Sequence, residues 1–201
     1  MHVARLLLVV MACLLGAQSF AQPASRRIRG DVSAVDGLKL EITTRSGEKV
    51  AIELDDKYAV SAVARIDIAA IKPGSYVGTA TLPQADGTQR ALEVLVFPES
   101  GRGVAEGHYP WDLQPGSMMT NATVAEIIDV DDGGRRMTLR YKDGEKVIAV
   151  PASAPVVTLE PGDRAMLKPG AHVMVGATVR PDGSLTASRI SVGKDGLVPP
   201  M

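Results

Sequence analysis

Histidine and methionine side chains stand at spacings in this chain that could bind a soft metal ion. His172 and Met174 flank one residue on an expected strand, and because side chains alternate along a strand, both should lie on one face. His108 and Met119 form a second pair, eleven residues apart. Imidazole and thioether donors suit copper(I), so these four residues predict a copper(I) site. The competing interpretation has Met174 filling a gap in the core and His172 at the rim of a barrel.

A second group of chemically useful side chains lies in the segment 98–120. His108, Tyr109 and Asp112 surround Trp111, the only tryptophan of a chain with 3% aromatic residues. Tyrosine and tryptophan bury a large area and keep a polar atom at one end, which suits a binding surface. These four residues therefore predict a ligand site in the connector. The alternative is structural, with Tyr109 and Trp111 filling the seam between two domains and fixing their orientation.

The elements that must position these residues occur twice. Gly47-Glu48-Lys49-Val50 returns as Gly144-Glu145-Lys146-Val147, 97 residues later. Lys72-Pro73-Gly74 returns as Lys168-Pro169-Gly170, 96 residues later. The order of the phrases is kept, and one residue is lost in a loop. Two copies of one small domain are therefore expected, because a solenoid needs several shorter repeats.

Each copy has the pattern of a small β-barrel. Leu38, Leu40 and Ile42 alternate with polar residues, which is the period of a half-buried strand. Residues 55–71, between the third and fourth expected strands, are rich in alanine and favour a short helix or helical turn. Three strands, a helical link and two strands are the element order of the oligonucleotide/oligosaccharide-binding (OB) barrel. The sequence predicts an all-β protein of two tandem OB-like five-stranded barrels, with another small barrel or a pair of sandwiches as the alternative.

The expected division of the chain follows from the repeats and the connector. It comprises a signal peptide (1–21), a first OB-like barrel (22–97), an ordered connector (98–120), a second OB-like barrel (121–193) and a C-terminal tail (194–201).

The N-terminus has the features of a secretory signal. Arg5 supplies positive charge, residues 6–15 are apolar, and Ser19-Phe20-Ala21 resembles a cleavage site. A lipoprotein signal ending at Cys13 is the alternative. Cleavage near Ala21 would remove the one cysteine and leave a periplasmic or secreted protein that relies on its own cores.

Charge and motif content exclude several function classes. Lysine and arginine number 22 against 23 acidic residues, so the chain lacks the net positive field that draws nucleic acid or an anionic membrane. After the signal there is no apolar run of about 18 residues, so no transmembrane segment is expected. Only His108 and His172 would remain after cleavage, and neither has a partner placed by a catalytic motif, so we expect no enzyme.

The repeated phrases, with Asp86-Gly87 and Asp182-Gly183 and a final valine-rich strand, resemble exported bacterial domains of unknown function. These look like small OB-type barrels that often occur in tandem. The connector residues His108 to Asp112, with Met118 to Asn121, resemble a subgroup labelled metal ABC transporter permeases. A permease needs several spanning helices, which this sequence does not predict. The resemblance implies the fold and export, and it carries no catalytic residues.

Together these features predict an exported, non-enzymatic binding or interaction module of the cell envelope. Its ligand or partner, a small molecule, a cation or an envelope protein, would bind at the seam between the barrels. The alternative function is a periplasmic copper(I)-handling accessory that uses His108, Met119, His172 and Met174.

Overall fold

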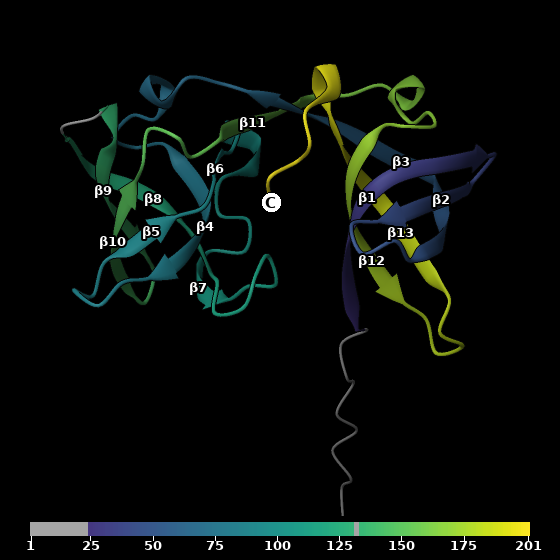
Figure 1. Ribbon diagram of the computed structural model, residues 1–201, viewed down its shortest axis with the longest axis horizontal. Helices are drawn as coiled ribbons and strands as arrows, with labels where there is room; N and C mark the ends of the chain where they lie inside the picture. The colour runs from purple at the N-terminus through teal and green to yellow at the C-terminus, as the bar shows by residue number, and fades with distance from the viewer. Residues whose placement is uncertain (1–23, 131–132) are drawn as a thin grey trace, which may run out of the picture.

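The computed structural model describes residues 24–130 and 133–201, and strands make up most of it (Figure 1). Strands account for 58% of the residues, so the predicted all-β class is confirmed. The predicted signal peptide lies outside the described residues. Within the described ranges, every helix is too short or too polar to cross a bilayer. The strands are β1 (Ser25–Asp36), β2 (Lys39–Thr44), β3 (Lys49–Arg65), β4 (Tyr76–Pro83), β5 (Gln89–Ala91), β6 (Val94–Val96), β7 (Gly107–Pro110), β8 (Met118–Asp129), β9 (Arg135–Tyr141), β10 (Gly144–Val150), β11 (Val156–Pro161), β12 (His172–Val179) and β13 (Leu185–Gly193).

Five of these strands form a closed ring, which we call the β1 barrel. β1 pairs with β2, β2 with the first half of β3, β3 with β13, β13 with β12, and β12 again with β1. Four of the pairings are antiparallel, and the β3–β13 pairing is parallel, with Val60 opposite Ile190. Ring closure gives each strand a neighbour on both sides, which protects its backbone hydrogen-bonding groups.

A second ring, the β8 barrel, repeats this arrangement. β8 pairs with β9, β9 with β10, β10 with β5, β5 with β4, and β4 with β8. The β10–β5 pairing is the parallel one, with Ala149 opposite Arg90. β7 adds to the edge of β8, and β6 lies between β4 and β11.

Each barrel takes its strands from both repeats. The β1 barrel joins β1, β2 and β3 of the first repeat to β12 and β13 of the second. The β8 barrel joins β8, β9 and β10 of the second repeat to β4 and β5 of the first. Figure 1 shows the exchange as purple and blue strands beside yellow ones in one lobe. The strand pairings therefore correct the predicted contiguous barrels, 22–97 and 121–193, because β3 does not turn back after the barrel but runs on to Arg65.

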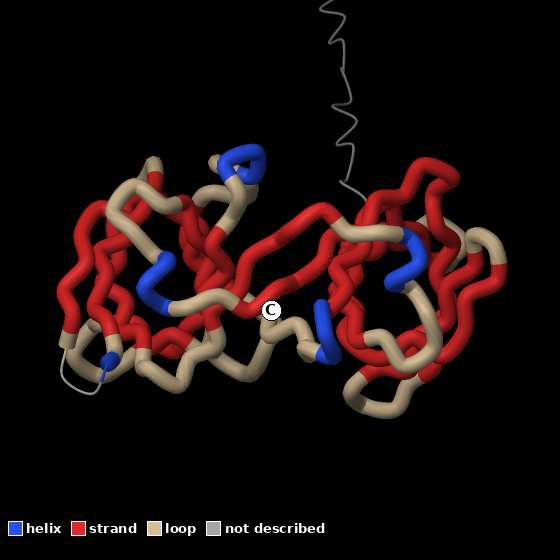
Figure 2. The backbone as a smooth tube through the Cα atoms, turned by 90° about the horizontal axis from the view of Figure 1, so that it is seen from above, coloured by secondary structure: helices blue, strands red, loops and turns tan. Residues whose placement is uncertain are grey.

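Two extended arms connect the barrels. The second half of β3 pairs antiparallel with β11, with Ser61 opposite Pro161 and Arg65 opposite Val157. Figure 2 shows these strands running side by side from one barrel to the other. Gly162 follows β11 and lies close against β3, since a Cβ there would lie 2.9 Å from Cγ1 of Val60. A larger residue would push the arms apart.

The helix expected within residues 55–71 is largely replaced by strand. Pairing of β3 with β13 and β11 overrides the helix propensity of its alanines. What remains is the 3-10 turn η1 (Ile68–Ala70), where the Asp67 carboxylate accepts a hydrogen bond from the N–H of Ala69. The second repeat has a corresponding turn, η4 (Arg164–Met166). The alanines in β3 are Ala51, Ala59, Ala62 and Ala64.

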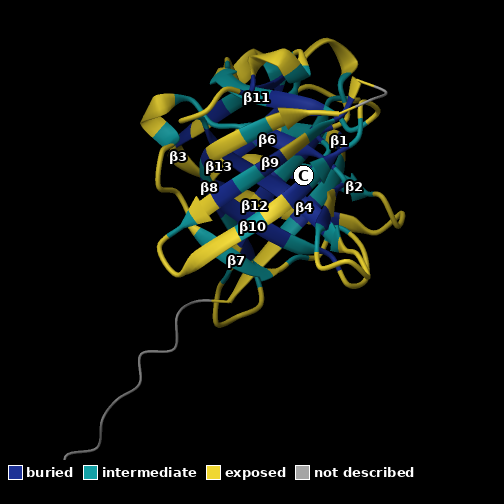
Figure 3. Cartoon of the chain, turned by 90° about the vertical axis from the view of Figure 1, so that its left-hand side faces the viewer, coloured by how far each residue is buried: buried dark blue, intermediate teal, exposed yellow. Residues whose placement is uncertain are grey.

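Each barrel encloses an apolar core drawn from both repeats. Leu40 and Val175 meet in the β1 barrel, and Val77 and Leu139 meet in the β8 barrel, all fully buried. Figure 3 shows buried residues alternating with exposed ones along the strands. Burial of one such side chain contributes about 1.5–3 kcal/mol, so the exchanged strands are held by the same cores that close the rings.

The repeated Gly-Glu-Lys-Val phrase lies differently in the two repeats. Leu40 is opposite Ile52 in the β2–β3 pairing, whereas Met137 is opposite Ile148 in the β9–β10 pairing. Because Leu40 and Met137 are equivalent, Ile52 and Ile148 are equivalent too. The alignment of the Gly-Glu-Lys-Val phrases differs from this structural register by one residue. Since a slip of one residue turns a side chain to the other face, Val50 is 6% exposed and Val147, in the same phrase, is 36% exposed.

Separating the repeats tests the exchange of strands. Each half, 24–103 or 104–201, carries three strands of one barrel and two of the other. We expect neither half alone to form a folded monomer, and equal amounts mixed to give a 1:1 complex with the amide NMR spectrum of the intact protein. The halves would be refolded separately and together and compared by gel filtration and NMR. A dispersed monomeric spectrum from one half, unchanged on mixing, would contradict the exchange.

Candidate functional site

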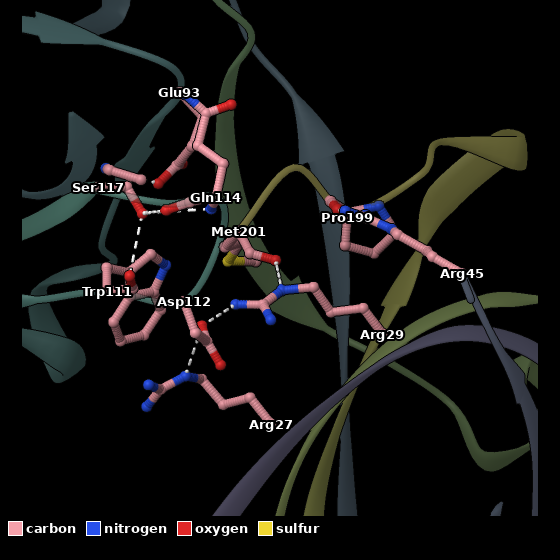
Figure 4. A network of polar contacts seen from close by, with 11 residues as sticks. Arg27, Arg29, Arg45, Glu93, Trp111, Asp112, Gln114, Ser117, Pro199 and Met201 are labelled. Carbon is pink, nitrogen blue, oxygen red and sulfur yellow. Dashed lines mark hydrogen bonds and ion pairs between the residues drawn. The ribbon is translucent and has the colours of Figure 1, made fainter. Parts of the chain in front are cut away.

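The loop that follows β7 carries Trp111 and Asp112 into the seam between the barrels, where they meet β1 (Figure 4). Ser117 orders this loop, because its hydroxyl lies 3.0 Å from the carbonyl oxygen of Trp111 and 2.8 Å from that of Gln114. The N–H of Trp111 also donates to the carbonyl of Ser117 at 2.8 Å. The loop is therefore built to present two consecutive side chains to the other barrel.

Two arginines of β1 receive these side chains. Cζ of Arg27 lies 3.9 Å from the centre of the Trp111 ring, in a cation–π contact. The Asp112 carboxylate accepts hydrogen bonds from Arg27 at 3.0 Å and from Arg29 at 2.7 Å. Burial would raise the pKa of Asp112, but the hydrogen bonds and charges of Arg29 and Arg27 outweigh it and lower that pKa. Asp112 is thus ionised at neutral pH and joins the two barrels electrostatically.

The C-terminal segment completes the seam. The main-chain oxygen of Met201 accepts a hydrogen bond from Arg29 at 2.6 Å, and that of Pro199 accepts one from Arg45 at 2.8 Å. The Met201 side chain is 4% exposed and packs with Leu95 and Val157 in an apolar cluster. The predicted tail 194–201 is therefore docked, and no sequence signal identified Arg45 or Met201 as seam residues.

The four predicted ligand-binding residues divide into two groups. Trp111 and Asp112 share the seam with Tyr109, whose ring lies 6.1 Å from that of Trp111. His108 precedes Tyr109 on β7, and successive strand residues face opposite sides. Its Nδ1 lies 2.8 Å from Oγ1 of Thr120, and its ring stacks with Tyr141 at 6.5 Å. Burial and the charge of Lys146 lower the pKa of His108.

The four predicted copper(I) ligands have separate neighbours. Val173 and Val175 face the core, so His172 and Met174 both lie on the outer face of the β1 barrel, as alternation predicts. Nδ1 of His172 is 2.5 Å from the Asp31 carboxylate, whereas Met174 packs in the apolar cluster of Met201. Met119 is buried on β8, next to the strand of His108. Among the described residues, no group of three or more His, Cys, Asp or Glu side chains could hold a metal ion.

Glu93 is a buried acid that sequence reasoning missed. It is 1% exposed, and its Oε1 accepts a hydrogen bond from the N–H of Ala80 at 3.0 Å. Burial raises the pKa of Glu93 to about 8, against the opposing effects of the Ala80 N–H and the charge of Arg29. Its Oε2 and the Nε1 of Trp111 are both buried without a hydrogen-bond partner among the described residues. Figure 4 shows Glu93 above the loop that carries Trp111.

Removing the charge of Asp112 tests the electrostatic link. Asp112→Asn loses ion pairs to Arg27 and Arg29, whose side chains are 33% and 10% exposed. We expect the free energy of unfolding in urea to fall by about 1 kcal/mol. Glu48→Gln is the matched control, because it breaks one pair with Arg26 in which both side chains are about half exposed. Equal losses in the two variants would show that Asp112 contributes no more than a surface pair.

Glu93→Gln tests the buried acid through the pH dependence of stability. Burial raises the pKa of Glu93 from 4.5 to about 8. Between these two pH values the acid is therefore protonated in the folded state and ionised in the unfolded state. The stability of the natural chain should therefore fall as the pH rises from about 4.5 to about 8, by up to about 1.4 kcal/mol per pH unit. Glu93→Gln lacks this decline, so its free energy of unfolding relative to the natural chain should increase as the pH rises from about 4.5 to about 8. Urea denaturation at several pH values measures this difference. A parallel pH dependence in both proteins would contradict the assignment, with exposed Glu126→Gln as the control for charge.

Comparison with known proteins gives no relative: no family model matches this chain, and no curated protein or solved structure matches it. The resemblance to exported bacterial domains therefore stays a prediction from the sequence.

Proposed function

We propose that this chain is an exported, non-enzymatic interaction module of the cell envelope, made of two OB-like barrels with exchanged halves. Its partner is an envelope protein that binds at the seam. The OB-like assignment is supported in both rings by the order of the strands and by the parallel pairing of the third and fifth strands. Export is supported by the signal-like residues 1–21.

One observation supports the seam as the partner-binding site. Arg27, Tyr109 and Trp111 form a cluster there with partly exposed side chains, and the Arg27 guanidinium lies against the indole face. Tryptophan, tyrosine and arginine are the residues most enriched at the energetic centres of protein interfaces. The chain has a single tryptophan, and it lies on a loop rather than in either barrel core. This composition favours a protein partner.

Copper(I) handling by His108, Met119, His172 and Met174 remains the alternative predicted by the sequence. Its four side chains have separate neighbours, so we give it no mechanism.

A pair of arginine variants tests the proposed partner site. Arg27→Ala removes the guanidinium over Trp111, whereas Arg164→Ala removes one that lies 4.1 Å from the ring centre of Tyr58 on the β1 barrel. Tagged proteins would be cross-linked in envelope fractions, and saturable partners would be identified and then titrated with purified protein. We expect Arg27→Ala to weaken partner binding about tenfold or more and Arg164→Ala to leave it unchanged. Equal affinity in both variants, or no saturable partner, would contradict a partner site at the seam.

A further inference from the structure

Each barrel has a hollow beside the turn that joins its fourth and fifth strands. The hollow of the β8 barrel has a volume of about 810 Å³, and that of the β1 barrel about 430 Å³. The first volume lies in the range of small-molecule sites. The larger hollow is lined by the turn Gln84–Thr88, by Arg90, by the start of β9 and by the end of β10 with the residues up to Ser153.

The two hollows occupy equivalent places in the duplicated fold. In the parallel pairing that closes the β8 barrel, Ala149 is opposite Arg90, and in the β1 barrel Glu53 is opposite Thr186. All four residues line their hollows. Arg180 of the smaller hollow likewise corresponds to Gln84 of the larger one. The duplication therefore supplies two versions of one surface that can be compared residue by residue.

Among the described lining residues the balance of charge is reversed, with three arginines and one carboxylate in the larger hollow and three carboxylates and one arginine in the smaller. Arginines at positions 90, 135 and 136 in the β8 barrel stand where the β1 barrel has Thr186, Leu38 and Lys39. Carboxylates differ in the opposite direction, being present in the smaller hollow and replaced in the larger one. The acidic residues of the smaller hollow correspond to small or cyclic apolar residues in the larger one, with Glu53, Asp55 and Asp56 matching Ala149, Pro151 and Ala152.

The three arginines have different roles. Arg135 is fixed in place, because it pairs with Asp129 at 2.9 Å and donates to the carbonyls of Ile68 and Ile71. Arg90 and Arg136 are exposed and make no ion pair with another described residue.

One carboxylate also lines the larger hollow among the described residues. Asp86 accepts hydrogen bonds from both the N–H and the hydroxyl of Thr88, at 3.0 and 2.7 Å. These bonds lower its pKa, so it is ionised. Its Oδ1 is thus engaged within the turn, and the charge of Arg136 also contributes to the lowered pKa of Asp86. Arg90 and Arg136 line the same hollow.

We propose that the hollow of the β8 barrel binds a small multivalent oxyanion, of the phosphate or carboxylate class, between Arg90 and Arg136. A planar guanidinium matches either group with two parallel hydrogen bonds. The apolar lining from Ala149, Pro151 and Ala152 accommodates the carbon part of an organic anion. This site is separate from the seam and does not depend on the proposed partner there.

Calorimetric titration with pyrophosphate at low salt tests the site, and citrate in a parallel titration distinguishes phosphate from carboxylate preference. We expect 1:1 binding that weakens about fivefold or more in Arg90→Gln and in Arg136→Gln. Lys39→Gln is the matched control, since Lys39 occupies the place of Arg136 in the other repeat, and it should bind as the natural chain does. All three changes are at exposed side chains, and thermal melting checks that each variant is folded.

Amide NMR spectra during the same titrations locate the site. We expect shifts confined to residues 84–90, 134–136 and 149–153. Absence of binding by both anions would overturn the proposal. So would equal weakening by Lys39→Gln, or shifts centred on the seam arginines, because either result would mean nonspecific attraction to positive charge.

Discussion

The structure depends on one kind of contact, the parallel pairing of the third strand of one repeat with the fifth strand of the other. β3 pairs in this way with β13, and β10 with β5. Each pairing closes a ring of five strands, and each needs a strand from the other half of the chain. In this structure each barrel is closed by strands of both repeats, so folding of the two barrels is expected to be coupled.

The exchange also explains what lies in the seam. The arms formed by β3 and β11 carry Val63 and Val157 out of the barrels, and these apolar side chains must be covered. Leu95, Met174 and Met201 cover them, and Arg29 and Arg45 hold the last residues of the chain in place. Asp112 and Trp111 then fasten the other face of the seam to β1. Strand exchange thus creates the seam, and the seam presents the aromatic and arginine side chains that we assign to partner binding.

Much of the fold could be predicted from the sequence, because alternation and repeated turn phrases are local signals. The repeats and the all-β class followed from them, whereas the interest in Trp111 and Asp112 came from the rare aromatic residues of the connector. The identity of the partner strands could not follow, since each repeat has a fourth and a fifth strand of its own that either barrel could take. The choice depends on whether the link after the third strand folds back or extends. Alanines at 59, 62 and 64 favoured a helix there, but in the structure tertiary pairing extends them as strand.

Cross-strand NMR contacts measure the central claim most directly. The exchange predicts backbone proton contacts between β1 and β12, such as Arg29 with Met174, and between β8 and β4, such as Ala122 with Val77. Contiguous barrels would instead pair β1 with β4 and β8 with β12. Contacts of the first kind in a monomeric sample would establish the exchanged barrels. Contacts of the second kind would contradict them and, with them, the account of how the seam arises.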